Sequence, residues 1–253
     1  MRQDERAPFV EALRRARLSA YAPGEFVEQE SFMLASEILG LARAAGIGPG
    51  VSLLDLCCGV AGSGRFITRE LGCAYLGVDS SSSAIEIART RALGLPCRFE
   101  VALVPPIPSG PFDVVLLLET MLAFPDKEPL LTAVARVLPA GGRFAFTLEE
   151  GLPLCDEERA SMPDADTVWP MPLEQLLAAL VRVGLSVRLQ EERSASHLAV
   201  ADALIAAFQE DADAISAQIG GPALEELLSA HRLWSDWLRS GRVRKFALVA
   251  EKL

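Results

Sequence analysis

A glycine-rich turn after a short apolar run constrains this fold more than any other stretch of the sequence. Asp55 ends the run, and Gly59, Gly62 and Gly64 follow it. Glycines at a turn let the backbone approach a ligand without an intervening Cβ, and the N-terminus of a following helix offers unpaired N–H groups. The pattern therefore predicts a strand, a loop and a helix, with a nucleoside-sized ligand at the loop.

The spacing of these glycines and the position of a second acid discriminate between nucleoside cofactors. The order is G-x-x-G-x-G, so the dinucleotide fingerprint G-x-G-x-x-G does not fit, and NAD is disfavoured. A second apolar run, residues 74–78, ends at Asp79. This acid follows Gly59 by about twenty residues, where nucleotide-binding βαβ units place a carboxylate. Asp79 is therefore predicted to bind the ribose hydroxyls of the ligand.

Asp55, the glycine-rich turn and Asp79 together resemble motifs I and II of the class I S-adenosylmethionine (SAM) methyltransferases. Motif I of that family runs E/D-x-G-x-G-x-G. Asp55 and Gly59 match it, whereas Cys57 and Ala61 replace two of its glycines. The resemblance covers roughly residues 48–190. It implies SAM as the cofactor and an α/β fold, with a doubly wound, Rossmann-like, seven-stranded and mostly parallel sheet whose last strand is antiparallel.

The same resemblance assigns cofactor contacts to the two motifs and to the ends of the third and fourth strands. Many family members carry an acid for adenine after the third strand, but this chain has Ala102 and Leu103, so backbone atoms would make that contact. Glu119 follows the expected strand 112–118 and should lie near the methionine end of the cofactor, with capping of the next helix as its alternative role. The implied cofactor residues are Asp55, Cys57, Gly59, Gly62, Gly64, Asp79, Ser80, Ala102, Leu103, Glu119 and Thr120.

Composition narrows the range of partners. With 253 residues, 51% of them hydrophobic, the chain can bury a full α/β core. Its formal net charge of −10 argues against nucleic acid as a partner. No apolar run reaches the length of about eighteen residues that a membrane span needs, and no apolar signal core follows the charged N-terminus. We therefore expect a cytoplasmic protein without membrane association.

The cysteines point away from metal and thiol chemistry. There are five, an odd number without paired metal-ligand spacing, which fits a reducing compartment. Cys57 and Cys58 are adjacent at the end of a buried strand, where small packing residues are more common than a reactive pair. The sequence predicts no metal site and leaves self-association into a homodimer open.

The order of apolar patterns divides the chain into three parts. Residues 1–46 are expected to form an N-terminal helical lid, with helices over 9–17 and 31–45. Residues 47–192 together with 243–253 should form the SAM-binding Rossmann-like core, whose later strands are expected near residues 98–102, 143–148, 185–189 and 246–250. Residues 193–242 are helical by pattern and should form a cap insertion over the substrate. This layout resembles the small-molecule branch of the family, including cyclopropane fatty-acid synthases and geranyl diphosphate C-methyltransferases.

The lid, the proline-rich loop 151–172 and the cap are each expected to contribute substrate contacts. The candidates are Tyr21, Phe26, Gln29, Trp169, Trp234 and Trp237, with ordinary packing as the alternative role for each. In-line methyl transfer mainly requires alignment of donor and acceptor and the exclusion of water. A hydroxyl or amine acceptor also needs a base. His231 and Glu149 are the catalytic candidates, and His197 is the other histidine.

Three functions are compatible with these residues. The first is a SAM-dependent methyltransferase that methylates O, N or C of a small metabolite in natural-product biosynthesis, by in-line transfer without a metal. The second is a natural-product cyclase or pericyclase-type enzyme that uses the cofactor structurally. The third is a non-catalytic SAM-binding module.

Overall fold

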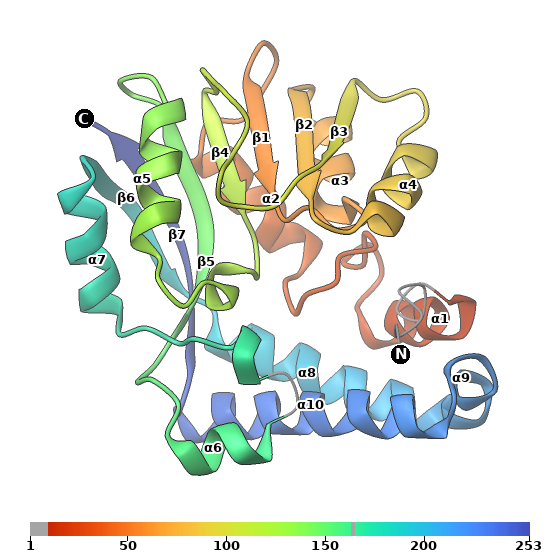
Figure 1. The fold of residues 1–253 in the computed structure, drawn as a ribbon. Coiled ribbons are helices and arrows are strands. Elements are labelled where there is room, and N and C mark those ends of the chain that lie inside the picture. The colour runs from red at the N-terminus through yellow and green to blue at the C-terminus, as the bar shows by residue number, and fades with distance from the viewer. Residues whose placement is uncertain (1–9, 163–164) are drawn as a thin grey trace.

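The computed structural model describes residues 10–162 and 165–253. Its centre is one seven-stranded sheet with helices on both faces, and a group of helices lies beneath one edge of it (Figure 1). Residues 1–9, which belong to the expected N-terminal lid and include Phe9, lie outside the described residues.

The strand order is that of a doubly wound sheet, β3-β2-β1-β4-β5-β7-β6. The first five strands are parallel, and β7 runs antiparallel to both of its neighbours, β5 and β6. This confirms the predicted fold. The strands are β1 (Ser52–Leu56), β2 (Ala74–Asp79), β3 (Cys97–Val101), β4 (Val114–Leu117), β5 (Arg143–Glu150), β6 (Leu185–Glu192) and β7 (Arg244–Lys252).

Both faces of the central strands are buried, as their continuously apolar sequences require. On one face, Leu54 and Leu56 pack with α5 (Glu128–Val137) and α7 (Leu173–Arg182). On the other face, Leu53 packs with residues of three helices. These are α2 (Ala35–Ala44), α3 (Gly62–Leu71) and α4 (Ser82–Arg91). Because successive side chains point to opposite faces of the sheet, β1 contributes residues to both cores.

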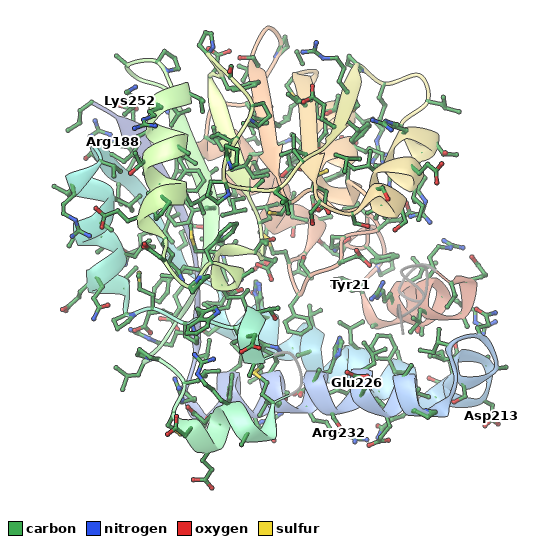
Figure 2. The ribbon with its side chains drawn as sticks, viewed as in Figure 1. Tyr21, Arg188, Asp213, Glu226, Arg232 and Lys252 are labelled. Atoms are coloured by element: carbon green, nitrogen blue, oxygen red, sulfur yellow. The ribbon has the colours of Figure 1, made fainter. Side chains whose placement is uncertain are left out.

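Three helices fill the chain between β6 and β7: α8 (Ser194–Glu210), α9 (Ala212–Ile219) and α10 (Gly221–Ser240). With α1 (Glu11–Ala20) they form a separate apolar cluster beneath the sheet (Figure 1). Glu226 and Arg232 belong to the solvent-exposed side of α10, and Asp213 to that of α9 (Figure 2). The amphipathic pattern therefore turns the apolar sides of these helices toward the molecule.

Packing and hydrogen bonds hold the described parts of the loop 151–172, which are residues 151–162 and 165–172. It contains α6 (Asp156–Ser161) and η3 (Ala165–Thr167), and its Trp169 N–H donates to the Leu122 carbonyl of η2 (Met121–Ala123) at 2.8 Å. The buried Lys127 ammonium donates to the carbonyls of Phe124 and Trp169 at 2.9 and 2.8 Å. Burial lowers the pKa of Lys127 to about 8.

The observed strands extend beyond their apolar runs at the ligand edge. β7 begins at Arg244, ahead of the expected residue 246, because Lys245 and Arg244 pair in register with Glu149 and Glu150 of β5. The helix expected over 31–45 begins only at Ala35, because residues 28–34 take a turn-rich path. The ends of β5 and β7 depend on how these two strands pair, and the hydropathy of either strand alone does not encode that pairing.

We predict that Gly64→Ala destabilises the protein by about 1–3 kcal/mol, because the added Cβ overpacks the core. An ideal Cβ there would lie 2.2 Å from the hydroxyl oxygen of Tyr75, whose side chain is fully buried. Gly40→Ala is the matched control. A Cβ on Gly40 in α2 meets nothing within 4 Å, so this change should stabilise by about 0.5–1 kcal/mol. Urea unfolding of both variants tests the pair, and equal effects would contradict it.

Candidate functional site

The first cavity, which we call the loop cavity, surrounds the glycine-rich turn and has a volume of about 290 Å³. It lies at the carboxyl ends of β1, β2 and β4, and residues 28–31 of the N-terminal segment form its other wall. The cofactor candidates that line it are Asp55, Cys57, Gly59, Gly62, Asp79, Glu119 and Thr120. The structure thus brings together residues from three strand ends that the sequence analysis had grouped.

The backbone of the turn keeps the conformation that glycine would favour, although two positions carry side chains. Cys57, Gly59 and Ala61 have φ angles of 55°, 53° and 55°. A left-handed residue with a Cβ costs roughly 1–2 kcal/mol. Cys57 and Ala61 therefore preserve the shape of the family motif at the expense of local strain.

Two glycines of the turn are required by close contacts. A Cβ on Gly62 would lie 2.2 Å from the Glu28 carbonyl oxygen, so Gly62 lets the 28–31 segment approach α3. Glu28 then forms ion pairs with Arg65 at 2.6 Å and Arg91 at 3.2 Å. Gly64 does not line the loop cavity, because the ring of Tyr75 fills the space beside it.

Both acids of the motifs are engaged with the protein. Asp79 accepts hydrogen bonds from the N–H groups of Gly59 at 2.8 Å and Ser81 at 2.9 Å, which fixes the turn to β2. Asp55 is buried and accepts from the Tyr75 hydroxyl at 2.6 Å. Burial raises the pKa of Asp55 to about 7, although the Tyr75 hydrogen bond opposes this.

Three other residues assigned to the cofactor lie outside the lining of the loop cavity. Ser80, Ala102 and Leu103 do not line it, and Leu103 is 74% exposed. The Ala102 N–H donates to the Asp79 carbonyl at 2.9 Å, which continues the pairing of β3 with β2. The adenine contact assigned to Ala102 and Leu103 stays a prediction.

A second cavity, also of about 290 Å³, lies between the strand ends and helices α1, α8 and α10. We call it the cover cavity. Gln29, Glu30, Ser31 and Glu119 line both cavities, so the two meet at these residues. Tyr21 contributes to the cover cavity from just after α1 and lies between the sheet and the C-terminal helices (Figure 2).

A buried ion-pair cluster stands at the boundary between the cavities. The Lys245 ammonium lies 2.6 Å from Glu119 Oε1 and also contacts Glu149 Oε1. The Nε2 atom of His197 lies 3.5 Å from Glu119 Oε2. Burial alone would raise the pKa of Glu119, but the Lys245 ammonium, followed by His197, holds it below the usual range. Glu119 also has a φ of 60°, and its N–H donates to Thr147 Oγ1 at 2.6 Å.

His231 faces the cover cavity as a neutral ring. Its Nδ1 lies 2.8 Å from the Leu227 carbonyl, which can only accept, so Nδ1 carries the proton and Nε2 is left as an acceptor. Burial lowers the pKa of His231 to about 4. The rings of Phe32 and Phe208 pack edge-on against it at 5.5 and 5.2 Å.

The substrate candidates divide between the cover cavity and its surroundings. Tyr21, Gln29 and Trp234 line the cavity together with the catalytic candidates Glu149 and His231. Gln29 is 3% exposed. Its amide donates to the carbonyls of Glu25 and Met33 at 2.8 Å each, so it braces the 25–33 segment.

Three aromatic candidates do not line the cover cavity. Phe26 packs against Tyr21 at 5.4 Å between ring centroids, and Trp237 is buried in a separate cluster with Val243. The Trp169 indole N–H donates to the Asp166 carbonyl at 2.9 Å, beneath the Arg159 guanidinium. These contacts support the packing role that was the alternative for each.

Lys245, Glu30, Ser31 and Phe32 were missed as site residues by the sequence analysis. Lys245 left one signal, since a lysine directly before the apolar residues of the last strand is unusual for a buried strand. Within residues 10–162 and 165–253, no group of three or more His, Cys, Asp or Glu side chains is arranged to hold a metal ion. No helix in the same part of the chain is long and apolar enough to cross a membrane.

Known proteins are similar to part of this sequence. Residues 53–142 match the family model described as "Methyltransferase domain". Phosphoethanolamine N-methyltransferase 1 from Arabidopsis thaliana is 33% identical over 99 residues, which are 38% of this chain and 20% of that protein. The chain spans less than half the length of the first curated relatives it matches.

Solved structures resemble almost the whole chain. The cyclopropane synthase MmaA2 from Mycobacterium tuberculosis has a TM-score of 0.82 at 16% identity, covering 97% of this chain and 95% of that one. The [4+2]-cyclase SpnF has a TM-score of 0.74 at 18% identity, covering 99% and 95%. Residues 53–142 therefore match a methyltransferase domain, and the fold of the chain is that of the class I SAM-dependent methyltransferases.

The raised pKa of Asp55 predicts a change of stability with pH. Because this pKa is above that of the unfolded chain, the stabilisation is complete below pH 4 and is lost as the pH rises through about 7. Asp55→Asn keeps an acceptor for Tyr75 but cannot ionise. Relative to the wild type it should gain roughly 2–3 kcal/mol between pH 5 and pH 8. Urea unfolding of the ligand-free proteins at both pH values measures this, and a parallel pH dependence in the two would refute it.

Proposed function

We propose that this chain is a SAM-dependent methyltransferase that binds SAM in the loop cavity and a small-molecule acceptor in the cover cavity. The observation that carries the proposal is the junction of the two cavities at Glu119 and residues 29–31. A methyl donor in one cavity and an acceptor in the other would meet at that junction. Alignment of two reactants in this way is the main contribution that such a protein makes to the rate.

The residues of the loop cavity fit SAM by charge and by shape. Five carboxylates line the cavity, from Glu28, Glu30, Asp55, Asp79 and Glu119. They suit a ligand that carries a sulfonium and an ammonium group. Each Asp79 oxygen accepts one backbone N–H and keeps a second lone pair for a ribose hydroxyl. The left-handed turn at Gly59 opens the backbone to the ligand.

SAM supplies an electrophilic methyl group when bound: the acceptor lone pair forms the new bond to carbon as the carbon–sulfur bond breaks toward sulfur, and the acceptor then loses a proton. The protein has to orient the acceptor and exclude water. The 28–31 segment closes the loop cavity and is tied to α3 and α4 by Glu28. Helices α8 and α10 close the cover cavity.

The acceptor should be a small metabolite. The cover cavity has the size of a small-molecule site, and the net charge of −10 disfavours polyanionic acceptors. The chemistry that these side chains offer does not call for a metal, since Glu149 and His231 supply proton acceptors within the cavity. Natural-product biosynthesis, a cytoplasmic location and a homodimer stay predictions.

A cyclase is the second candidate, favoured by the structural likeness to SpnF. In that function the same two cavities would hold the cofactor and a polyene, and no methyl group would be consumed. Incubation with methyl-labelled SAM separates the two candidates, because only methyl transfer moves the label to a product.

We predict that Asp79→Ala weakens SAM binding roughly 10- to 100-fold, since each hydrogen bond to a charged group contributes about 1.5–3 kcal/mol. Glu86→Ala, which removes an exposed carboxylate of α4, is the control and should bind SAM as the wild type does. Isothermal titration with SAM, its demethylated product S-adenosylhomocysteine (SAH) and NAD measures the affinities. Unchanged affinity in Asp79→Ala, or a preference for NAD, would refute the assignment.

We also predict different effects for the two tryptophans of α10. Trp234 lines the cover cavity, so Trp234→Ala should raise the KM for the acceptor several-fold and leave the SAM affinity within about twofold. Trp237 is buried outside the cavity, so Trp237→Ala should mainly lower the free energy of unfolding, by about 3 kcal/mol. Steady-state kinetics and urea unfolding of both variants test this. The reverse pattern would place the acceptor elsewhere.

A further inference from the structure

One carboxylate oxygen of Glu149 has no hydrogen-bond partner among the residues that the structure describes. Glu149 is 6% exposed and lines the cover cavity. Its Oε1 atom contacts the Lys245 ammonium, but Oε2 is buried and accepts no hydrogen bond from any residue that the structure describes. An unpaired buried acceptor costs about 1–3 kcal/mol, and more when it is charged. A donor on the bound acceptor molecule would remove this cost.

Glu149 also shares its ion-pair partner with a second carboxylate. Lys245 is one ammonium facing two carboxylates, Glu119 and Glu149. The Nε2 atom of His197 lies 3.5 Å from Glu119 Oε2, whereas Lys245 is the ion-pair partner of Glu149 among the described residues. Arg17 also lines the cavity, and its guanidinium lies 3.5 Å from Glu30. A buried charge is costly until an opposite charge and hydrogen bonds compensate it.

The aromatic and aliphatic residues that line the cover cavity suit a ligand that carries a positive charge on an apolar skeleton. Phe32 and Trp234 present aromatic surfaces to the cavity, and Leu204 and Leu238 add aliphatic surface. Aromatic faces attract ammonium groups by about 0.5–2 kcal/mol. His231 adds no positive charge, since the cavity holds it as a neutral ring.

We propose that the methyl acceptor is an amine on a small apolar skeleton, and that its nitrogen donates a hydrogen bond to Glu149 Oε2. This inference rests on the proposed function. The amine enters as an ammonium, and Glu149 accepts one proton from it, which frees the nitrogen lone pair for the new bond to the methyl carbon. The methylated nitrogen then carries the positive charge, and Glu149 releases its proton to water.

Other acceptors fit these side chains less well. A hydroxyl group would donate to Oε2 but would bring no positive charge to the two carboxylates that share Lys245. An alkene or an activated carbon offers no donor, so Oε2 would stay unpaired. An anionic acceptor such as a carboxylate would add repulsion to both glutamates.

The first test compares two probes of the same shape, benzylamine and benzyl alcohol, by calorimetric titration in the presence of SAH. The wild-type protein should bind the amine at least about tenfold more tightly than the alcohol. Glu149→Gln should abolish this preference. Glu150→Gln is the matched control and should preserve it, because the neighbouring Glu150 is paired with Arg244 at 2.9 Å and does not line the cavity.

Equal affinities of the wild type for the two probes, including undetectable binding of both, overturn the proposal, as does a preference that persists in Glu149→Gln. A second measurement needs no variant. SAM with a ¹³C-labelled methyl group is incubated with the wild-type protein and a metabolite extract, and the carbon shift of the product assigns the methyl group to N, O or C. We expect an N-methyl product, and an O-methyl or C-methyl product overturns the proposal even where Glu149→Gln fails to fold.

These outcomes also separate the inference from the proposed function. Binding of SAM with label on an oxygen or a carbon leaves the methyltransferase assignment in place and removes the amine. Absence of SAM binding, or of any labelled product, removes the methyltransferase assignment itself.

Discussion

The contact of Lys245 with Glu119 and Glu149 is the interaction on which the site depends. It joins the end of β4, the end of β5 and the beginning of β7 at one point. A lysine can reach this point only because β7 is antiparallel to β5, which places its first residues at the edge where the parallel strands end. The ammonium neutralises carboxylates that would otherwise repel each other in a buried place.

The same topology determines where the helical insertion lies. β6 and β7 are antiparallel neighbours, so β6 ends and β7 begins at the same edge of the sheet. Whatever chain connects them must lie at that edge, which in open α/β sheets is the edge that binds ligands. Helices α8, α9 and α10 are this connection, and they close a cavity over the strand ends. Their position follows from strand direction and needs no separate signal.

Local pattern was sufficient to predict the turn, both acids and all seven strands, because each depends on neighbours in the sequence. Glu119 was also found, since a strand end is a local feature. The contact of Gly64 with Tyr75 was not predicted, because Tyr75 belongs to the next strand. The partnership of Lys245 with Glu149 depends on the register of β5 and β7, and no single-strand pattern contains a register. The different surroundings of Trp234 and Trp237 depend on how α10 packs against loop 151–172.

Backbone strain and buried carboxylates are both concentrated at the site. Cys57, Ala61 and Glu119 hold left-handed backbone angles, and each stores energy that the surrounding core must offset. Asp55 and Glu149 are buried acids, one with a raised pKa and one with an unpaired oxygen. Ligands that carry positive charge would relieve the electrostatic part of this cost in both cavities. A SAM sulfonium in the loop cavity and an ammonium in the cover cavity would each meet carboxylates, and Glu119 faces both. Glu149 would take a proton from that ammonium before transfer, so the nitrogen that approaches the SAM methyl group would be neutral and would not be repelled by the sulfonium.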